Sequence, residues 1–128
     1  MLTVADIMNR KLLYISEGDR VSLARGKILE FGVTAVPVLD DEHKPVGVVS
    51  LRDLAHADER PRSTGPVRMV RGTASVDEGA RELASYGMHH LVVVDDGGVA
   101  IGMVSAIDFV RALVGLPVSH PQAFERYD

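Results

Sequence analysis

The chain has 128 residues, of which 46% are hydrophobic and 25% are charged, and its formal net charge is −4. This balance is typical of a soluble globular domain and is too apolar for a disordered chain. The acidic balance gives no general attraction to nucleic acid or to anionic lipid. The absence of cysteine excludes disulfides, thiolate zinc sites and a cysteine nucleophile. The sequence lacks the apolar stretch of a signal peptide and has no membrane span, so we expect a cytoplasmic protein.

Hydrophobic periodicity predicts the secondary structure. Apolar residues at helical spacing predict one helix that starts at Val21 and another that starts at Val76. Gly32 and Gly87 follow these helices, at the place where a left-handed residue often ends a helix. Short β-branched runs predict strands. In chain order we expect a helical turn at 4–8, a strand at 12–15, a helix at 21–31, strands at 36–39 and 46–49, a helix at 51–57, a strand at 67–70, a helix at 76–86, strands at 91–94 and 99–104, and a helix at 106–114.

The chain contains an internal repeat. Residues 21–54 align without a gap on residues 76–109, with a shift of 55 positions and nine identical pairs among 34. The identical pairs are Val21/Val76, Gly32/Gly87, Val38/Val93, Asp40/Asp95, Asp41/Asp96, Gly47/Gly102, Val49/Val104, Ser50/Ser105 and Asp53/Asp108. Self-similarity of this kind indicates two copies of one structural unit.

The repeat predicts an α/β (α+β) fold of two β-α-β-β-α units. One unit of roughly 55 residues buries too little apolar surface to be stable alone, so we expect the two to pack by pseudo-twofold symmetry into one core, with their sheets facing each other. We expect the first repeat, with its N-terminal entry segment, at 1–57, a linker at 58–66, the second repeat at 67–114 and a C-terminal tail at 115–128.

One motif, G-h-h-S-x-x-D (h, apolar), occurs at the same place in both repeats. It runs from Gly47 through Ser50 to Asp53 and from Gly102 through Ser105 to Asp108. A strand is expected to end and a helix to start at each serine. Serine followed by an acidic residue three positions later is also a helix-capping box, so a purely structural role is the alternative to a binding site.

The same motif suits a ribonucleotide. The start of a helix attracts a phosphate group, and a carboxylate accepts hydrogen bonds from the two hydroxyls of a ribose. The glycine three residues before each serine would allow a ligand to approach the backbone closely. Strands lined by Val, Ile and Met would then hold a flat base by apolar contact.

The duplicated unit resembles a tandem pair of cystathionine-β-synthase (CBS) domains, often called a Bateman module. The resemblance rests on the paired G-h-h-S-x-x-D joints, on the strand at 36–40 (VPVLD) and on the opening at 4–8 (VADIM), and it covers about residues 3–114. One departure is Val92, which stands where the first repeat has Pro37 and the family often has proline. The resemblance implies a regulatory, stand-alone module that senses AMP, ADP, ATP or S-adenosylmethionine in clefts between the repeats and transmits binding to a partner.

The resemblance also implies the roles of individual residues. Asp53 and Asp108 would bind the ribose hydroxyls. The phosphate or ribose contacts would come from Ser50, Ser105, Arg52, His89 and His90, and the base contacts from Val36, Val48, Leu91 and Met103. Because His89 and His90 have no basic counterpart in the first repeat, we expect two unequal sites.

Several residues keep a second interpretation. His89 and His90 could be ligand contacts, ordinary surface histidines or metal ligands. The acidic pairs at 40–41 and 95–96 are typical of turns, with metal binding as the alternative. Met69, Met88 and Met103 could line a base pocket, although methionine more often fills a core.

No catalytic signature is present in the sequence, so we expect a binding protein that is not an enzyme and needs no cofactor or metal. We expect a homodimer, because the pseudo-symmetric module would expose apolar helix faces that suit a twofold contact. Two other functions remain open. The chain could be a structural or interaction subunit with non-functional pockets, or a phosphohydrolase that uses His89 or His90.

Overall fold

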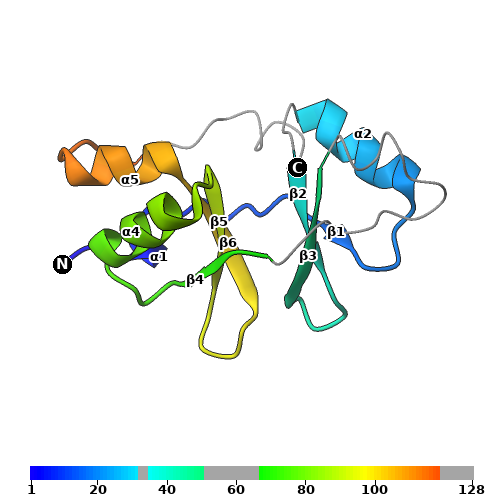
Figure 1. The fold of residues 1–128 in the computed structure, drawn as a ribbon. Helices are drawn as coiled ribbons and strands as arrows, with labels where there is room; N and C mark the ends of the chain where they lie inside the picture. Colours follow the sequence, from blue (N-terminus) through cyan, green and yellow to red (C-terminus); the bar gives the residue numbers. More distant parts are fainter. Residues whose placement is uncertain (32–34, 51–66, 119–128) are drawn as a thin grey trace.

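Two three-stranded sheets, one from each repeat, organise the molecule (Figure 1). The computed structural model describes residues 1–31, 35–50 and 67–118. The elements in chain order are α1 (Val4–Ile7), β1 (Ile15–Ser16), α2 (Val21–Phe31), β2 (Ala35–Leu39), β3 (Pro45–Ser50), β4 (Met69–Arg71), α4 (Val76–Tyr86), β5 (His90–Val94), β6 (Ala100–Ser105) and α5 (Ala106–Leu113). This order confirms the mixed α+β class and most of the expected elements. The helix expected at 51–57, the linker and the end of the tail lie outside the described residues.

The two sheets have the same topology. In the first, β2 pairs in parallel with β1 and antiparallel with β3; in the second, β5 pairs in the same way with β4 and β6. The register also repeats, because the shift between Val38 and Leu39 recurs between Val93 and Val94, 55 positions later. The duplication seen in the sequence is therefore a duplication of strand pairing.

Helices cover the outer face of each sheet, and the two sheets lie next to each other in the middle of the molecule (Figure 1). Most buried side chains of the described residues form two clusters, one in each repeat, and not the single core that the repeat predicted. The first-repeat core contains Ile15, Ala24, Ile28, Val36, Val38 and Val49. The second-repeat core contains Val4, Ile7, Met8, Val70, Val76, Leu83, Leu91, Val93, Val104 and Phe109.

The N-terminal helix α1 packs into the core of the second repeat. The main-chain N–H groups of Val4 and Ala5 donate to the carbonyl oxygens of Ala74 (2.9 Å) and Gly72 (3.0 Å). The chain then crosses to the first sheet, and Asn9 exchanges two main-chain hydrogen bonds with Met103 on the way (2.8 and 2.9 Å). β1 is only Ile15–Ser16 and pairs with Val38 and Leu39, so the strand expected at 12–15 is wrong for residues 12–14.

Helix α4 has the ends that the sequence predicts. Ser75 caps its start, since the Ser75 hydroxyl oxygen accepts a hydrogen bond from the N–H of Glu78 (3.1 Å). Gly87 ends it in the left-handed conformation, with a φ of 65°. A glycine adopts this conformation without the steric cost of a Cβ atom, so the predicted role of Gly87 is confirmed. Its counterpart Gly32 lies outside the described residues.

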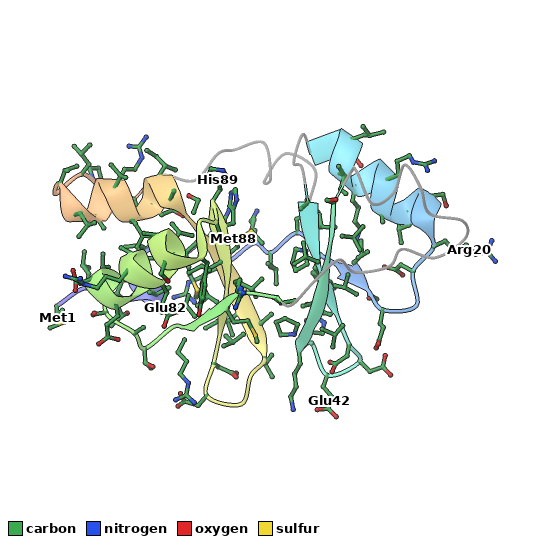
Figure 2. All side chains as sticks on the ribbon, in the orientation of Figure 1. Met1, Arg20, Glu42, Glu82, Met88 and His89 are labelled. Carbon is green, nitrogen blue, oxygen red and sulfur yellow. The ribbon has the colours of Figure 1, made fainter. Side chains whose placement is uncertain are left out.

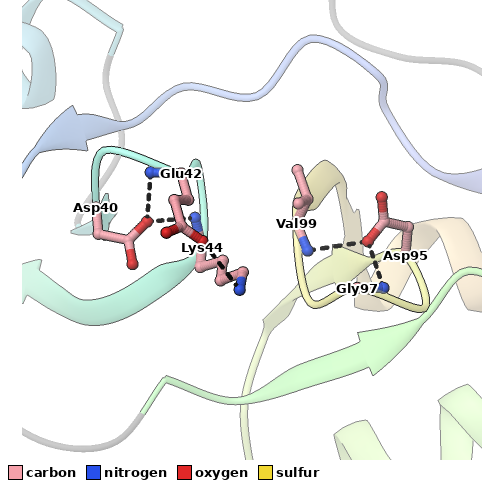
Figure 3. Close-up of polar contacts among 6 residues, drawn as sticks. All are labelled: Asp40, Glu42, Lys44, Asp95, Gly97 and Val99. Atoms are coloured by element: carbon pink, nitrogen blue, oxygen red, sulfur yellow. Dashed lines mark hydrogen bonds and ion pairs between the residues drawn. The ribbon is translucent and has the colours of Figure 1, made fainter.

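The acidic pairs form the hairpin turns (Figure 3). Asp40 Oδ1 accepts hydrogen bonds from the N–H groups of Glu42 and Lys44, both at 2.9 Å. Asp95 Oδ1 accepts the equivalent bonds from Gly97 (2.9 Å) and Val99 (3.0 Å). The predicted turn-forming role is therefore confirmed for the first aspartate of each pair.

Candidate functional site at the start of helix α5

The second copy of the repeated motif forms the joint between β6 and α5. Ser105 is the N-cap of α5, and its main-chain N–H donates to Asp108 Oδ2 at 2.9 Å. The N–H of Asp108 donates in return to Ser105 Oγ at 3.3 Å. The helix-capping alternative is therefore correct for this joint.

Capping leaves part of the Asp108 carboxylate for other partners. Asp108 is only 4% exposed, and it is the one charged side chain that is buried in the described part of the chain. Both bonds of the capping box use Oδ2 or the main chain, and Oδ1 accepts no hydrogen bond from residues 1–31, 35–50 or 67–118. A carboxylate oxygen is a strong acceptor, so Asp108 has the capacity to bind a hydroxyl donor through Oδ1.

The glycine of the motif has a different role from the one expected. A Cβ atom on Gly102 would lie 2.6 Å from the carbonyl oxygen of Asn9 and 2.8 Å from Met8 Sδ. The chain's own N-terminal segment therefore makes the close approach for which a ligand was proposed. The expectation that this position admits a ligand is wrong for Gly102.

The two neighbouring histidines lie beside the joint. The N–H of Ala106, the first residue of α5, donates to the carbonyl oxygen of His89 at 2.9 Å. His90 is the cross-strand partner of Ser105. Both side chains are exposed, and Figure 2 shows His89 where β5 begins, close to the start of α5. The tertiary structure thus brings His89, His90, Ser105 and Asp108 together.

His90 is electrostatically linked to the joint. Although its side chain is exposed by surface area, the surrounding protein partly desolvates the ring, and this lowers the pKa of His90 below its ordinary value. The neighbouring His89 lowers it as well, whereas the carboxylate of Asp108 opposes both effects. His90 is therefore mostly neutral at pH 7, close to an acidic group.

The first repeat differs at the equivalent position. Ser50 is half-buried, and its cross-strand partner is Ala35, which occupies the place that His90 has in the second repeat. The predicted ligands Asp53 and Arg52 lie outside the described residues. In the part of the first joint that the structure describes, no histidine stands opposite the serine.

The four residues expected to contact the base divide into two groups. Val36 and Leu91 are each 1% exposed and belong to the two cores. Val48 and Met103 are half-buried. Each lies next to a core residue in its own strand and pairs with a residue of the neighbouring strand. The predicted contact of these four side chains with a base stays a prediction.

Tyr14, Lys27 and His43 form a cluster that no sequence pattern predicts. The rings of Tyr14 and His43 make an edge contact with centroids 5.1 Å apart, and the Tyr14 hydroxyl lies 3.4 Å from His43 Nε2. Lys27 Nζ donates to the carbonyl oxygen of Tyr14 at 2.7 Å. A tyrosine, a lysine and a histidine so far apart in the chain carry no recognisable spacing, so only the fold could reveal their contact.

Within the residues that the structure describes, no three His, Cys, Asp or Glu side chains are grouped so that they could hold a metal ion. Over the same part of the chain, no helix has the length and apolar character needed to cross a membrane.

Comparison with known families decides the identity of the fold. The model of the CBS domain matches twice, at residues 4–60 and 63–115. The chain belongs to the CBS domain family. The two matched segments correspond to the two repeats, and the first includes α1, although α1 packs on the second.

Relatives of this CBS-domain pair are larger proteins. The chain is 31% identical over 133 residues to the uncharacterized protein YtoI of Bacillus subtilis, covering 100% of this chain and 29% of YtoI. It is 25% identical to protein MK0525 of Methanopyrus kandleri, covering 86% and 62%. A homoserine O-acetyltransferase of Methanococcus vannielii is 26% identical, and the match spans only 24% of that enzyme. The chain thus spans less than two thirds of each of these relatives, and the match to the acetyltransferase is not evidence for catalysis by this chain.

Solved structures share the fold over nearly the whole chain. CBSX2 of Arabidopsis thaliana is 28% identical, with a TM-score of 0.72 over 89% of this chain and 95% of CBSX2. The structure of CBSX2 in complex with AMP gives a TM-score of 0.77 at 28% identity, covering 90% and 98%. The CBS domains of a Streptococcus pneumoniae transcriptional regulator give 0.77 at 17% identity, covering 87% and 98%, which supports the fold alone.

Proposed function

We propose that this CBS-domain pair is a regulatory module that binds an adenosine-containing ligand, namely AMP, ADP, ATP or S-adenosylmethionine. The observation that carries the proposal is the AMP complex of CBSX2, a protein 28% identical to this chain over 90% of its length. The polar groups gathered at the start of α5 support it, because they combine a helix N-terminus with a buried carboxylate.

In the second repeat, each polar group has a distinct role. Asp108 accepts the ribose hydroxyls through Oδ1, while Oδ2 continues to cap the helix. Ser105 and the two histidines, His89 and His90, contact the phosphate or ribose, since they surround the positive end of α5. Leu91 and Met103 would contact the base.

In the first repeat, the equivalent site uses Asp53 for the ribose and Ser50 with Arg52 for the phosphate or ribose. Val36 and Val48 would contact the base. The absence of a histidine opposite Ser50 makes this site the weaker one for a phosphate group.

The response to the ligand is a change in how the two repeats are arranged. A ligand can shift such an equilibrium only if it binds the two arrangements with different affinities. We expect the module to act as a homodimer on a regulated partner in the cytoplasm. Apolar side chains at Ile107, Val110 and Leu113 of α5, which are 51–58% exposed, provide a surface for such contacts.

Calorimetric titration with AMP, ADP, ATP and S-adenosylmethionine tests the proposal. We expect saturable binding of at least one of these ligands, and a competition experiment with neutral adenosine would measure what the phosphate contributes. If none of the four ligands binds to the folded protein, the proposal is refuted.

The alternative function is a structural or interaction subunit with non-functional pockets. The capping box favours it, because Asp108 already has a structural role in the absence of any ligand. The calorimetric titration of the wild type distinguishes the two functions, since a non-functional pocket predicts no binding of any of the four ligands.

A further inference from the structure

His90 lies opposite the helix cap of the second joint. As the cross-strand partner of Ser105, it has its Cβ atom about 4.5–5.5 Å from that of the helix cap. Its neighbour His89 is joined to the first residue of α5 by the hydrogen bond between its carbonyl oxygen and the N–H of Ala106. The side chain of His90 therefore leaves the strand next to the positive end of α5, where a phosphate group would bind.

The charged and titratable groups of the elements next to His90 belong to β5, to α5 and to the start of β4. His89 is next to it on the same strand, and Asp108 acts on it from α5. Arg111 lies one turn further along α5, and Arg68, from the β4 side, stacks over the ring of Tyr86 at 4.4 Å. Within residues 1–31, 35–50 and 67–118, Asp108 is thus the group that favours protonation of His90, while partial burial and His89 lower the pKa of His90.

We propose that the second-repeat joint is a proton-linked phosphate site: a phosphorylated adenosine ligand takes up a proton at His90 when it binds. This inference rests on the proposed function and specifies the class of ligand and its regulation. The ligand is an adenine nucleotide, and the site binds it more tightly as the pH falls.

The physical reason is the charge of the ligand. A phosphate group with a charge near −2 stabilises the imidazolium form, so His90 gains a proton on binding at neutral pH. Affinity therefore rises as the pH falls through the range between the pKa of His90 in the complex and its lower pKa in the free protein. A cationic sulfonium group disfavours the imidazolium, so S-adenosylmethionine gains nothing from this residue.

The proton linkage belongs to the second repeat. Ala35 occupies the equivalent position opposite Ser50 in the first repeat and cannot take up a proton. Protonation of His90 therefore does not change the affinity of the first-repeat joint, which has Ala35 in this place.

Calorimetry of AMP binding near pH 7.5, in two buffers with different ionisation enthalpies, measures the number of protons taken up. We expect uptake of a fraction of one proton, and an affinity that falls by up to about tenfold per pH unit as the pH rises. His90→Asn should abolish the uptake, whereas His43→Asn, at a histidine of the first repeat, should retain it. Titration with neutral adenosine should show no uptake.

A second measurement keeps the test decisive if His90→Asn binds too weakly. The ring resonances of His90, assigned by their loss in His90→Asn, give its pKa by NMR in the free and the AMP-saturated protein. A higher pKa in the complex supports the inference, and an equal or lower value overturns it. AMP binding without proton uptake overturns this inference alone, whereas the absence of binding by all four adenosine ligands overturns the proposed function with it.

Discussion

The main-chain N–H of Ala100 donates a hydrogen bond to the carbonyl oxygen of His43 at 2.9 Å, and so joins the hairpin of the first repeat to the first residue of β6. His43 and Ala100 are not symmetric partners. The pseudo-symmetric counterpart would need an N–H at position 45, and Pro45 has none. The contact between the repeats is therefore asymmetric, and it involves the strand that ends at Ser105.

Removal of the Ala100 N–H should lower the stability of the folded protein. We expect Ala100→Pro to lower the free energy of unfolding by about 0.5–1.5 kcal/mol, the net value of one hydrogen bond. The first repeat already carries proline at the equivalent position, so the backbone accommodates it. Urea denaturation measures the effect, and Ala100→Ser, which keeps the N–H, is the control. Equal losses in the two variants would contradict the role of the hydrogen bond.

His43 occupies a left-handed conformation, with a φ of 62°, which costs energy for any residue with a Cβ atom. His43→Ala and His43→Gly both remove the contact with Tyr14, but only glycine relieves the backbone. We expect the glycine variant to be more stable than the alanine variant by about 1 kcal/mol in thermal or urea denaturation. Gly98 has a φ of 83° at the equivalent place in the second repeat, which supports this ranking. A glycine variant no more stable than the alanine variant would refute it.

A methyl group at position 102 should disrupt the packing of the N-terminal segment. Because the clash is with the carbonyl oxygen of Asn9, which is backbone, Gly102→Ala should destabilise the protein by about 1–3 kcal/mol or more. Gly26→Ala is the matched control, since Gly26 is exposed within α2 and a Cβ atom there would meet nothing within 4 Å. We expect this control to raise stability by up to about 1 kcal/mol. Comparable effects at the two positions would contradict the close approach of Asn9.

The charge of Asp108 should matter for binding more than for folding. Asp108→Asn keeps an oxygen that can cap α5, and we expect AMP affinity to fall by about ten- to a hundredfold, the loss of one or two charge-assisted hydrogen bonds. Asp77→Asn, which removes a carboxylate from the first turn of α4, is the control with the same change in net charge. Calorimetry measures both affinities. Unchanged affinity in the folded Asp108 variant would assign this residue to capping alone.

His90 should also make stability depend on pH. Because the pKa of His90 is lowered in the folded protein, the unfolded chain binds more protons as the pH falls below about 6.5. The contribution of His90 is therefore complete above this pH and is lost as the pH falls toward the lowered value. We expect the wild type to lose more stability than His90→Asn between pH 8 and pH 5 in urea denaturation. Parallel losses in the two proteins would contradict the lowered pKa.

The sequence predicted features that depend on residues close together in the chain. Asp40 and Asp95 bond to N–H groups two and four residues away, and Ser105 and Asp108 cap a helix three residues apart. Such contacts follow from local backbone geometry, so spacing alone identifies them. The functional interpretation of Asp108 stayed open for the same reason, because capping and ligand binding use the same residues.

By itself, the sequence determined the duplication, the order of helices and strands and the family. Each of these depends on the spacing of apolar, glycine, serine and aspartate residues, and this spacing repeats 55 positions later. Only the tertiary structure decided that α1 joins the second core, that Asn9 lies against Gly102 and that His43 is bonded to Ala100. These contacts join segments far apart in the chain, and their partners are chosen by which apolar faces can be buried together. The residue pattern within one segment therefore does not predict which distant segment it will contact.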